Sequence, residues 1–278
     1  MFQNRRLYIA TNHRKEEVIQ PLFESKLKVQ CVVPEDFDSD SLGTFSGEIE
    51  RLLSPIETAR KKCAIVAEKY NTDLVIASEG SFGPHPLFGL VPMDEEILVF
   101  MDLKNKLEII HVERTIKTNF CSEQIETVQD LTKFAEKVGF PSHGLILKGK
   151  LNGKEKYFKG IVDHSMLIKY FLSLKKRQDT ITGETDMRAM FNPTRMEIIQ
   201  QAAINLVKKI NNLCPNCASP GFGAERSIPG LPCAQCSLPT RSIKANIFQC
   251  LKCSFEQEVE ITSHNKTEDP MYCDFCNP

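Results

Sequence analysis

The chain has 278 residues, more than the ~100–200 of a typical domain, so its length predicts two domains while leaving one large domain open. Its hydrophobic content of 41%, charged content of 26% and near-equal numbers of Lys+Arg (35) and Asp+Glu (36) describe an ordinary soluble globular protein and name no partner. The sequence holds no signal-peptide core and no run of about eighteen apolar residues, which predicts a cytoplasmic protein that does not span a membrane.

Short strands alternate with helices at the start of the chain. Residues 6–10 (RLYIA) predict a first strand, the polar turn of residues 11–15 follows, and a one-sided helix leads to a second strand over 28–33. A long helix is expected over 54–70. The next strand, 73–78, runs into the segment EGSFGPHP, and a carboxylate with glycines at the end of a strand is a usual setting for an α/β active site.

The following elements include hairpins, which make a fully parallel sheet unfavourable. They are a hairpin of strands 95–102 and 107–116, a helix over 122–138, a hairpin of strands 143–150 and 154–161, and a helix over 164–175. Asn192 is expected to cap a last helix that has Pro193 at its first position and ends near Asn211. We therefore predict a mixed-sheet α/β domain over residues 1–211 and a separate module over 212–278.

Eight of the eleven cysteines lie in four Cys-x-x-Cys turns, here called knuckles. They are Cys214 and Cys217, Cys233 and Cys236, Cys250 and Cys253, and Cys273 and Cys276. One such turn aims both sulfurs at a metal about 2.3 Å away, and two turns complete a tetrahedral four-cysteine shell. The spacing predicts two closed, structural zinc sites in a reducing compartment, with a redox dithiol and an iron–sulfur cluster as alternatives.

The pairing of the knuckles is less directly encoded. Between residues 233 and 261 a predicted strand joins two knuckles and another strand follows them, the pattern of a zinc ribbon. This pattern favours a nested pairing, in which the two inner knuckles share one metal and the two outer knuckles share the other. Sequential pairing stays open. Basic residues of this double zinc-ribbon module alternate with glutamates, so its charge does not support nucleic-acid binding.

Three polar clusters lie beside the predicted elements, at residues 11–15, at Glu57 with residues 60–62, and at residues 78–81. A loop between a strand and a helix offers free backbone N–H groups, and a nearby lysine adds a compact positive charge, which suits phosphate. Glu79 is suited to hold Mg²⁺ or to activate water. The alternatives are helix capping for the first two clusters, with Glu57 in a capping box, and a solvated loop for Glu79.

The order IATNHRK, SPIETARKKCAIVAEKY and VIASEGSF resembles the motif order of the inosine triphosphate pyrophosphatase/Maf superfamily over about the first eighty residues, with weaker support from TDMRAMFNPTR. The resemblance implies an inosine triphosphate pyrophosphatase-like fold. It also implies a nucleotide site made of Thr11, Asn12 and Lys15 on the phosphates, Glu57 and Glu79 on Mg²⁺ or water, Lys62 on the phosphate chain, and Arg188 and Arg195 near the base or phosphates. Where the superfamily carries two adjacent aspartates, this chain has Ser78-Glu79.

Motifs along the whole chain, among them CPNC, PGLPC, NPTRM and CDFCNP, more closely resemble a bacterial family known as domain of unknown function 6671, which implies no activity. We expect a Mg²⁺-dependent nucleoside triphosphate pyrophosphatase-like hydrolase with a structural zinc module, acting on a nucleotide or another phosphate-bearing small molecule. The alternative is a non-catalytic protein that binds nucleotide, nucleic acid or a protein partner on the same scaffold. A homo-oligomer stays open.

Overall fold

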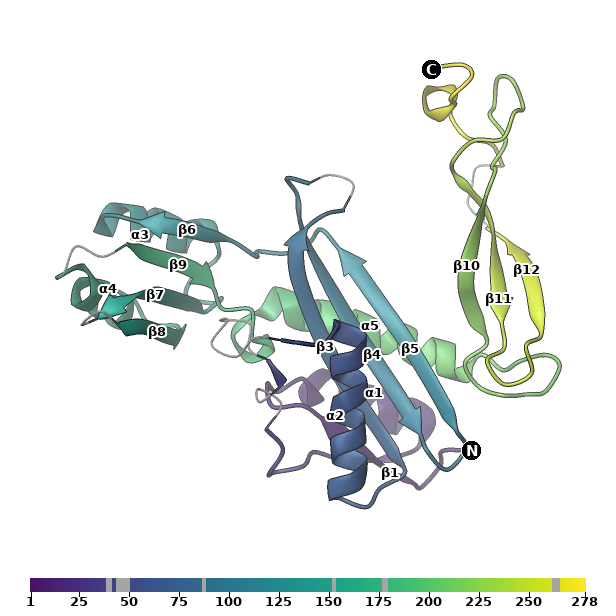
Figure 1. Cartoon of the computed structure of the whole chain (residues 1–278), viewed down its shortest axis with the longest axis horizontal. Coiled ribbons are helices and arrows are strands. Elements are labelled where there is room, and N and C mark those ends of the chain that lie inside the picture. Colours follow the sequence, from purple (N-terminus) through teal and green to yellow (C-terminus); the bar gives the residue numbers. More distant parts are fainter. Residues whose placement is uncertain (39–41, 44–50, 87–88, 152–153, 177–179, 262–265) are drawn as a thin grey trace. The chain divides into compact units, whose positions relative to one another are not determined.

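The computed structural model describes residues 1–38, 42–43, 51–86, 89–151, 154–176, 180–261 and 266–278 (Figure 1). The chain divides into two compact units, unit 1 over Met1–Leu206 and unit 2 over Val207–Pro278. The division falls inside the last long helix, α5 (Pro193–Asn211), whereas the sequence suggested the end of that helix. None of the helices in the described ranges is long and apolar enough to cross a membrane.

The first half of unit 1 is built on a mixed sheet. Its strands are β1 (Arg6–Ala10), β2 (Gln30–Val32), β3 (Leu74–Pro84), β4 (Pro92–Asp102) and β5 (Leu107–Thr115). They lie in the order β2-β1-β3-β4-β5, with β1 parallel to both of its neighbours and the β3-β4 and β4-β5 pairs antiparallel. The expected mixed sheet of an α/β fold is therefore confirmed.

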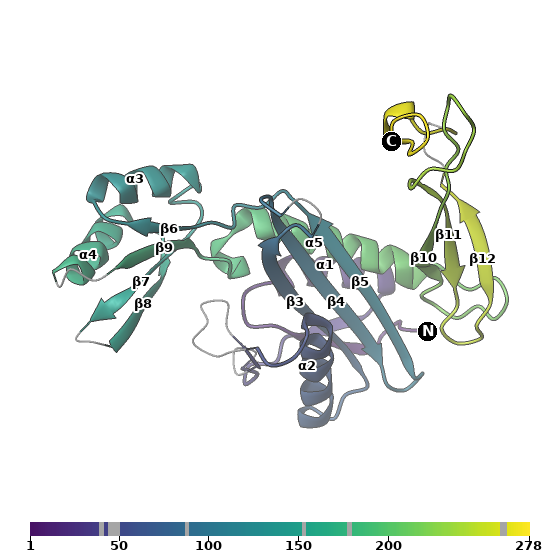
Figure 2. The same cartoon turned by 45° about the horizontal axis from the view of Figure 1, so that its top comes forward.

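Helices cover both faces of this sheet (Figures 1 and 2). They are α1 (Glu16–Leu27), α2 (Pro55–Lys69) and the first turns of α5. On one face, Cys63 and Val66 of α2 pack against Val99 of β4. Successive residues of a strand point to opposite faces, so Phe100 points the other way, where its ring stacks on Phe23 of α1 with centroids 6.1 Å apart.

β3 is longer than predicted and continues through the segment expected to be a loop. Its pairing with β4 extends to Pro84, opposite Pro92, whereas its parallel pairing with β1 ends at Ala77. The expectation of a polar loop after residue 78 is wrong, because the antiparallel partner supplies hydrogen bonds to the backbone there. Glu79 and Gly80 consequently lie beyond the end of β1, on an extension of the sheet formed by β3, β4 and β5.

The second half of unit 1 forms a four-stranded antiparallel sheet. Its elements are β6 (Ser122–Ile125), α3 (Val128–Lys137), β7 (Leu145–Leu151), β8 (Lys154–Ile161), α4 (His164–Lys175) and β9 (Ile181–Thr185). The strand order is β6-β9-β7-β8, and a short 3-10 turn (Ala189–Phe191) leads on to α5. α3 and α4 cover one face, where Phe134 and Phe171 pack against Leu147.

The helix predicted over 122–138 is wrong at its start. The Thr127 hydroxyl accepts a hydrogen bond from the N–H of Asp130 at 3.1 Å, and the Asp130 carboxylate accepts one from the N–H of Thr127 at 2.9 Å. This capping box fixes the first helical residue at Val128. Residues 122–125 instead pair with β9, a strand that the sequence did not predict.

Unit 2 contains a three-stranded antiparallel sheet with knuckles at its ends. Its elements are β10 (Gly223–Pro229), β11 (Ile243–Gln249), β12 (Glu256–Glu260) and a 3-10 turn, η3 (Pro270–Tyr272). β11 is the central strand. The register sets Gly223 opposite Gln249 at one end of the β10-β11 pair and Pro229 opposite Ile243 at the other. This register places the first and third knuckles at one end of the sheet and the second knuckle at the other.

Candidate metal centres and candidate phosphate site

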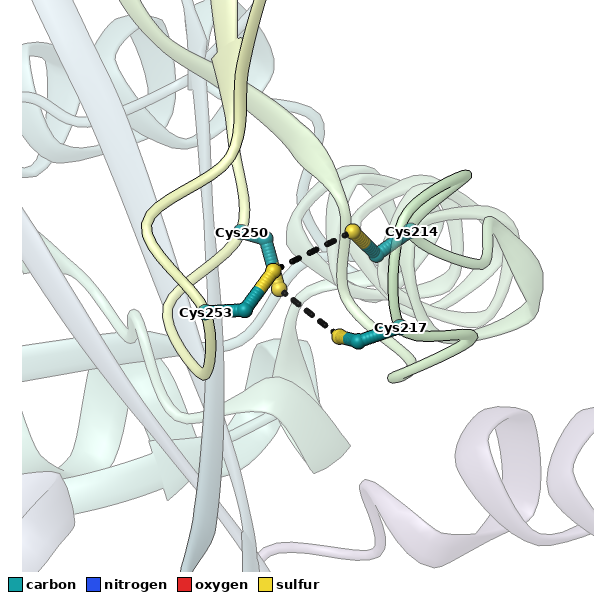
Figure 3. Close-up of side chains that lie close together, drawn as sticks. All are labelled: Cys214, Cys217, Cys250 and Cys253. Atoms are coloured by element: carbon teal, nitrogen blue, oxygen red, sulfur yellow. Dashed lines mark hydrogen bonds between the residues drawn. The ribbon is translucent and has the colours of Figure 1, made fainter.

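The knuckle cysteines of unit 2 form two groups of four. The groups are Cys214, Cys217, Cys250 and Cys253 (Figure 3), and Cys233, Cys236, Cys273 and Cys276, with the ligand atoms of each group within 4.8 Å of one another. Between facing knuckles the Sγ–Sγ distances are 3.7 and 3.6 Å in the first group and 3.9 and 3.6 Å in the second. Four sulfurs at ~2.3 Å from a tetrahedral metal would lie ~3.8 Å apart. Each group could therefore hold one zinc ion in a closed shell.

The pairing of the knuckles is interleaved, so the nested pairing favoured by the sequence is wrong. The first knuckle meets the third, and the second meets the fourth. The register of β10 with β11 brings the first and third knuckles to one end of the sheet. At the other end, a bridge between Cys233 and Glu268 aligns the last segment with the second knuckle. β10, which the sequence did not predict, carries the chain from the first knuckle at one end of the sheet to the second at the other, and β11 carries it back to the third.

The knuckles share a backbone design. The N–H of the residue after each second cysteine donates to the carbonyl of the first cysteine, at 2.8 to 3.0 Å. In three knuckles this residue is Ala218, Ser237 or Ser254, each with a positive φ of 55 to 59° that usually favours glycine. The turn tightness needed to converge two sulfurs thus outweighs the local backbone preference.

Polar groups around two of the sulfurs, those of Cys253 and Cys233, favour the thiolate, which is the metal-binding form. The Asn216 side-chain amide lies 3.5 Å from Sγ of Cys253 and, with the N–H of Phe255, lowers the pKa of that thiol to about 6. The N–H groups of Cys236 and Gln235 lower the pKa of Cys233 to about 7. Each group of four therefore contains a cysteine prepared to lose its proton near neutral pH.

A second set of polar residues surrounds Glu79 of unit 1. Glu79 is only 7% exposed, and its carboxylate lies 2.5 Å from Nζ of Lys62 on α2 and 3.3 Å from Nη1 of Arg51. Arg51 also donates to the carbonyl of Gly80 at 3.1 Å. Burial raises the pKa of Glu79, but the neighbouring cations Lys62, Lys15 and Arg51 outweigh it and hold the pKa below its usual value. Glu79 is an ion-paired carboxylate.

Lys15 lies on the other side of the same strand. It is 5% exposed at the start of α1, and its Nζ donates to Oγ of Ser78 at 3.0 Å. Burial, together with the charge of Arg195, lowers the pKa of Lys15 to about 7. The structure thus places Lys15, Lys62 and Glu79 around one stretch of β3.

Arg195 is buried at the first turn of α5 and joins that helix to the sheet. Its backbone N–H donates to Oδ1 of Asn192 at 3.0 Å, which confirms Asn192 as the helix cap. The guanidinium donates from Nε to Oε1 of Glu96 at 2.5 Å and from Nη1 to the carbonyl of Met187. Glu96 and Arg195 are both fully buried, so this is an interior ion pair.

Gly80 provides the space that this ion pair occupies. A Cβ at Gly80 would collide with the guanidinium of Arg195 and would lie 2.8 Å from Oε1 of Glu96. The same guanidinium lies over the ring of Phe82, 5.0 Å from its centroid. The glycine in the SEG segment is therefore required by a close side-chain approach rather than by a turn.

The other predicted site residues lie apart from these contacts. Glu57 forms the capping box of α2, where its carboxylate accepts from the N–H of Ser54 at 2.9 Å, and the Ser54 hydrogen bonds hold its pKa below the usual value. Thr11 is buried, with its N–H donating to the carbonyl of Ile9 at 3.0 Å, and Asn12 is exposed. Among the described residues, Glu57 makes no hydrogen bond or ion pair with Glu79.

Arg188 is held within the second half of unit 1. Its guanidinium makes a two-pronged ion pair with the fully buried Asp186, from Nε at 3.0 Å and from Nη2 at 2.6 Å. The guanidinium also lies over the ring of Phe191, 4.6 Å from the centroid. These contacts fix the turn that precedes α5, and Met187 of that turn lines the pocket described next.

A pocket of about 240 Å³ opens beside Glu79. One wall comes from β3 and Arg51, and the other from the four-stranded sheet. The lining residues are Gly43, Arg51, Glu79, Gly80, Ser81, Phe82, Phe120, Ile146, Glu184, Thr185 and Met187. The rings of Phe82 and Phe120 lie 5.7 Å apart at a tilt of 31°. The pocket combines a charged end with an apolar, partly aromatic wall.

Two buried carboxylates of β4 were not singled out by the sequence. Asp94 and Glu96 are 1% and 0% exposed, and they pair in register with Phe82 and Gly80. Burial and the adjacent Glu96 carboxylate raise the pKa of Asp94 to about 8. The signal that could have found them is a pair of acids two residues apart at the entrance to an apolar strand, because such acids share one face of the sheet.

The buried ammonium of Lys15 makes the stability of unit 1 depend on pH. Its pKa is about 7 in the folded chain, against ~10.4 for an unfolded one, so between these values only the unfolded chain holds the proton and the free energy of unfolding rises with pH. We expect Lys15→Met to be more stable than wild type by on the order of a few kcal/mol near pH 7, with the gain shrinking as pH rises toward 10.

Urea unfolding of both proteins at several pH values measures this difference. Lys61→Met is the matched control, because Lys61 is an exposed lysine on α2 and should give a difference that does not change with pH. A Lys15→Met difference that is equally flat would contradict the buried charge.

Comparison with known proteins places the chain in a family. No curated protein matches it. Among solved structures, the crystal structure of protein VC0702 from Vibrio cholerae is similar over 75% of this chain and 96% of that chain, at 8% sequence identity and a TM-score of 0.35. The family model described as a domain of unknown function, DUF6671, matches residues 62–278, from Lys62 of α2 through the last knuckle. The chain therefore belongs to the DUF6671 family.

Proposed function

We propose that the chain is a nucleoside triphosphate pyrophosphatase-like hydrolase whose reaction takes place in the pocket beside Glu79, with unit 2 as a structural zinc module. The observation that carries this proposal is the placement of Glu79, a buried carboxylate in the pocket wall held between Lys62 and Arg51. Two cations beside a carboxylate suit the triphosphate chain and the activation of water against its phosphoanhydride bond.

The two ends of the pocket suit the two ends of a nucleotide. Arg51 lines the pocket and offers a forked guanidinium to phosphate oxygens, and Lys62, which is buried against Glu79 outside the lining, offers a compact ammonium next to it. Phe82, Phe120 and Met187 offer apolar surface on which a base could stack. The volume of about 240 Å³ lies below the ~300–1,000 Å³ of most ligand pockets, so we expect part of the nucleotide to remain outside it.

The ion pairs of Glu79 provide a route to a general base. In the free protein Lys62 and Arg51 hold the pKa of this carboxylate low, which makes it a weak base. A phosphate that drew these two cations away would raise the pKa of Glu79 and increase its ability to take a proton from water. Substrate binding would in this way activate the base.

The carboxylates first expected to hold Mg²⁺ do not fit that role together. Glu57 is hydrogen-bonded within its helix cap, and both oxygens of Glu79 face cations. Bound Mg²⁺ would supply charge neutralisation on the phosphate oxygens. The roles of Glu79, Lys62 and Arg51 in orienting phosphate and water follow from their own contacts.

Hydrolysis is tested with the purified, zinc-loaded chain, Mg²⁺ and a panel of canonical and modified nucleoside triphosphates. We expect release of pyrophosphate, its loss in Glu79→Gln with nucleotide binding retained, and a fall in nucleotide affinity of about tenfold or more in Lys62→Met, since a hydrogen bond to a charged group contributes ~1.5–3 kcal/mol. Lys61→Met, the neighbouring exposed lysine, should bind and turn over like wild type.

A second candidate is a nucleotide-binding protein without turnover, on the same scaffold. It is favoured by the ion pairing of Glu79 and by the absence, among the described residues, of a contact that brings Glu57 to it. This candidate predicts Lys62-dependent binding of nucleotide with no phosphate or pyrophosphate released. Equal nucleotide affinity in wild type and Lys62→Met would defeat both candidates.

A further inference from the structure

Two carboxylates of β4 point away from α2 toward the buried side that α1 and α5 cover. Asp94 pairs with Phe82 and Glu96 with Gly80 in the antiparallel register, and paired residues of neighbouring strands share a face. Gly80 and Phe82 themselves line the pocket beside Glu79. Asp94 and Glu96 therefore lie on the strand next to the one that lines the proposed nucleotide site.

Three oxygen atoms of this pair are left unsatisfied. Oε1 of Glu96 accepts a hydrogen bond from Arg195. The other three oxygens, Oε2 of Glu96 and both carboxylate oxygens of Asp94, are buried and have no hydrogen-bond partner among the described residues. Asp94 is 1% exposed, so water from the surface does not reach it freely. Burying polar oxygens without partners is strongly unfavourable, and buried carboxylates are normally paired or bound to a metal.

The neighbouring cations donate hydrogen bonds to groups other than Asp94. Nζ of Lys15 donates to Ser78, and the guanidinium of Arg195 donates to Glu96 and to the carbonyl of Met187. Both lie close enough to influence Asp94 electrostatically, yet neither makes a hydrogen bond to it. Glu96 thus has one direct cationic partner, and Asp94 has none among the described residues.

We infer that Asp94 and Glu96 form a binding site for one divalent cation with a preference for oxygen ligands, such as Mg²⁺ or Mn²⁺. Mg²⁺ is commonly held by only one or two carboxylates, with water and substrate phosphates completing an octahedral shell. The three unpartnered oxygens supply the protein ligands. The phosphate ligand rests on the proposed function, whereas cation binding by the two carboxylates does not.

Mn²⁺ binding to the zinc-loaded full chain tests the site without any nucleotide. Electron paramagnetic resonance of free Mn²⁺ gives the number of ions bound, and we expect one per chain. Asp94→Asn, which keeps the side-chain shape and removes no hydrogen bond, should weaken Mn²⁺ binding by on the order of tenfold or more. Thermal unfolding checks that the variant is folded, and Mn²⁺ should stabilise wild type but not Asp94→Asn.

Glu95→Gln is the matched control, because Glu95 is the residue between the two ligands and points to the opposite face, where it pairs with Arg114 at 2.6 Å. Its Mn²⁺ affinity should equal that of wild type. Unchanged affinity in Asp94→Asn, or no Mn²⁺ bound by wild type at millimolar concentration, would overturn the inference. Mn²⁺ binding that depends on Asp94 in a protein that binds no nucleotide would uphold this site and reject the proposed function.

Discussion

Replacing Cys214 by serine is expected to remove one of two zinc ions per chain and to leave the other in place. The loss follows because a closed shell of four thiolates has no spare ligand, and structural zinc contributes ~10–16 kcal/mol of apparent binding free energy to small zinc domains. Cys250→Ser should give the same loss, since both residues belong to one group of four. Zinc content by mass spectrometry of the metal in the purified variants measures the result.

Double variants separate the interleaved pairing from its rivals. Cys214→Ser/Cys250→Ser should still hold one zinc ion, whereas Cys214→Ser/Cys233→Ser should hold none. The nested pairing predicts instead that Cys214→Ser/Cys273→Ser retains one ion, and sequential pairing predicts the same of Cys214→Ser/Cys233→Ser. Either of these last two results would contradict the arrangement in the structure.

Replacing Arg195 by methionine is expected to cost unit 1 about 3–5 kcal/mol of unfolding free energy, the range for breaking a buried ion pair by removing one partner. The loss is large because the carboxylate of Glu96 would remain buried without its guanidinium partner. Urea unfolding at neutral pH measures it. Adding Glu96→Gln to Arg195→Met should recover part of the loss, because the unbalanced charge is then gone.

Arg114→Met provides the comparison for an exposed pair. Arg114 contacts Glu95 on the outer part of the same β4-β5 pair, and its side chain is 61% exposed. Surface ion pairs contribute little, so this variant should unfold close to wild type. If Arg195→Met and Arg114→Met had the same free energy of unfolding, the buried ion pair would not stabilise the packing of α5 on the sheet.

Local signals in the sequence predicted much of the fold. The β4-β5 and β7-β8 hairpins follow from alternating apolar residues around short turns, and the start of α5 follows from the side chain of Asn192. The sequence did not predict β6 and β9, because they have only four and five residues and pair across a separation of about sixty residues. Pairing at such distance depends on the packing of α3 and α4, which no local pattern records.

For the candidate sites too, local features could be predicted from the sequence and long-range contacts could not. The spacing of each knuckle fixes a tight turn and two convergent sulfurs, so the eight ligands could be predicted from the sequence. Which knuckles meet depends on the register of β10 with β11, and that information lies outside the turns. The roles of Gly80 and Glu96 were hidden for a related reason, since both depend on a guanidinium that arrives from residue 195.

The interleaved knuckles also set the order in which unit 2 can form. The loop closed by the first metal runs from Cys214 to Cys253 and contains the second knuckle, while the loop closed by the second metal runs from Cys233 to Cys276 and contains the third. During synthesis neither loop can close until its last knuckle has emerged. Closing the first loop restricts the second knuckle and reduces the entropy cost of closing the second, so metal uptake should be sequential and cooperative.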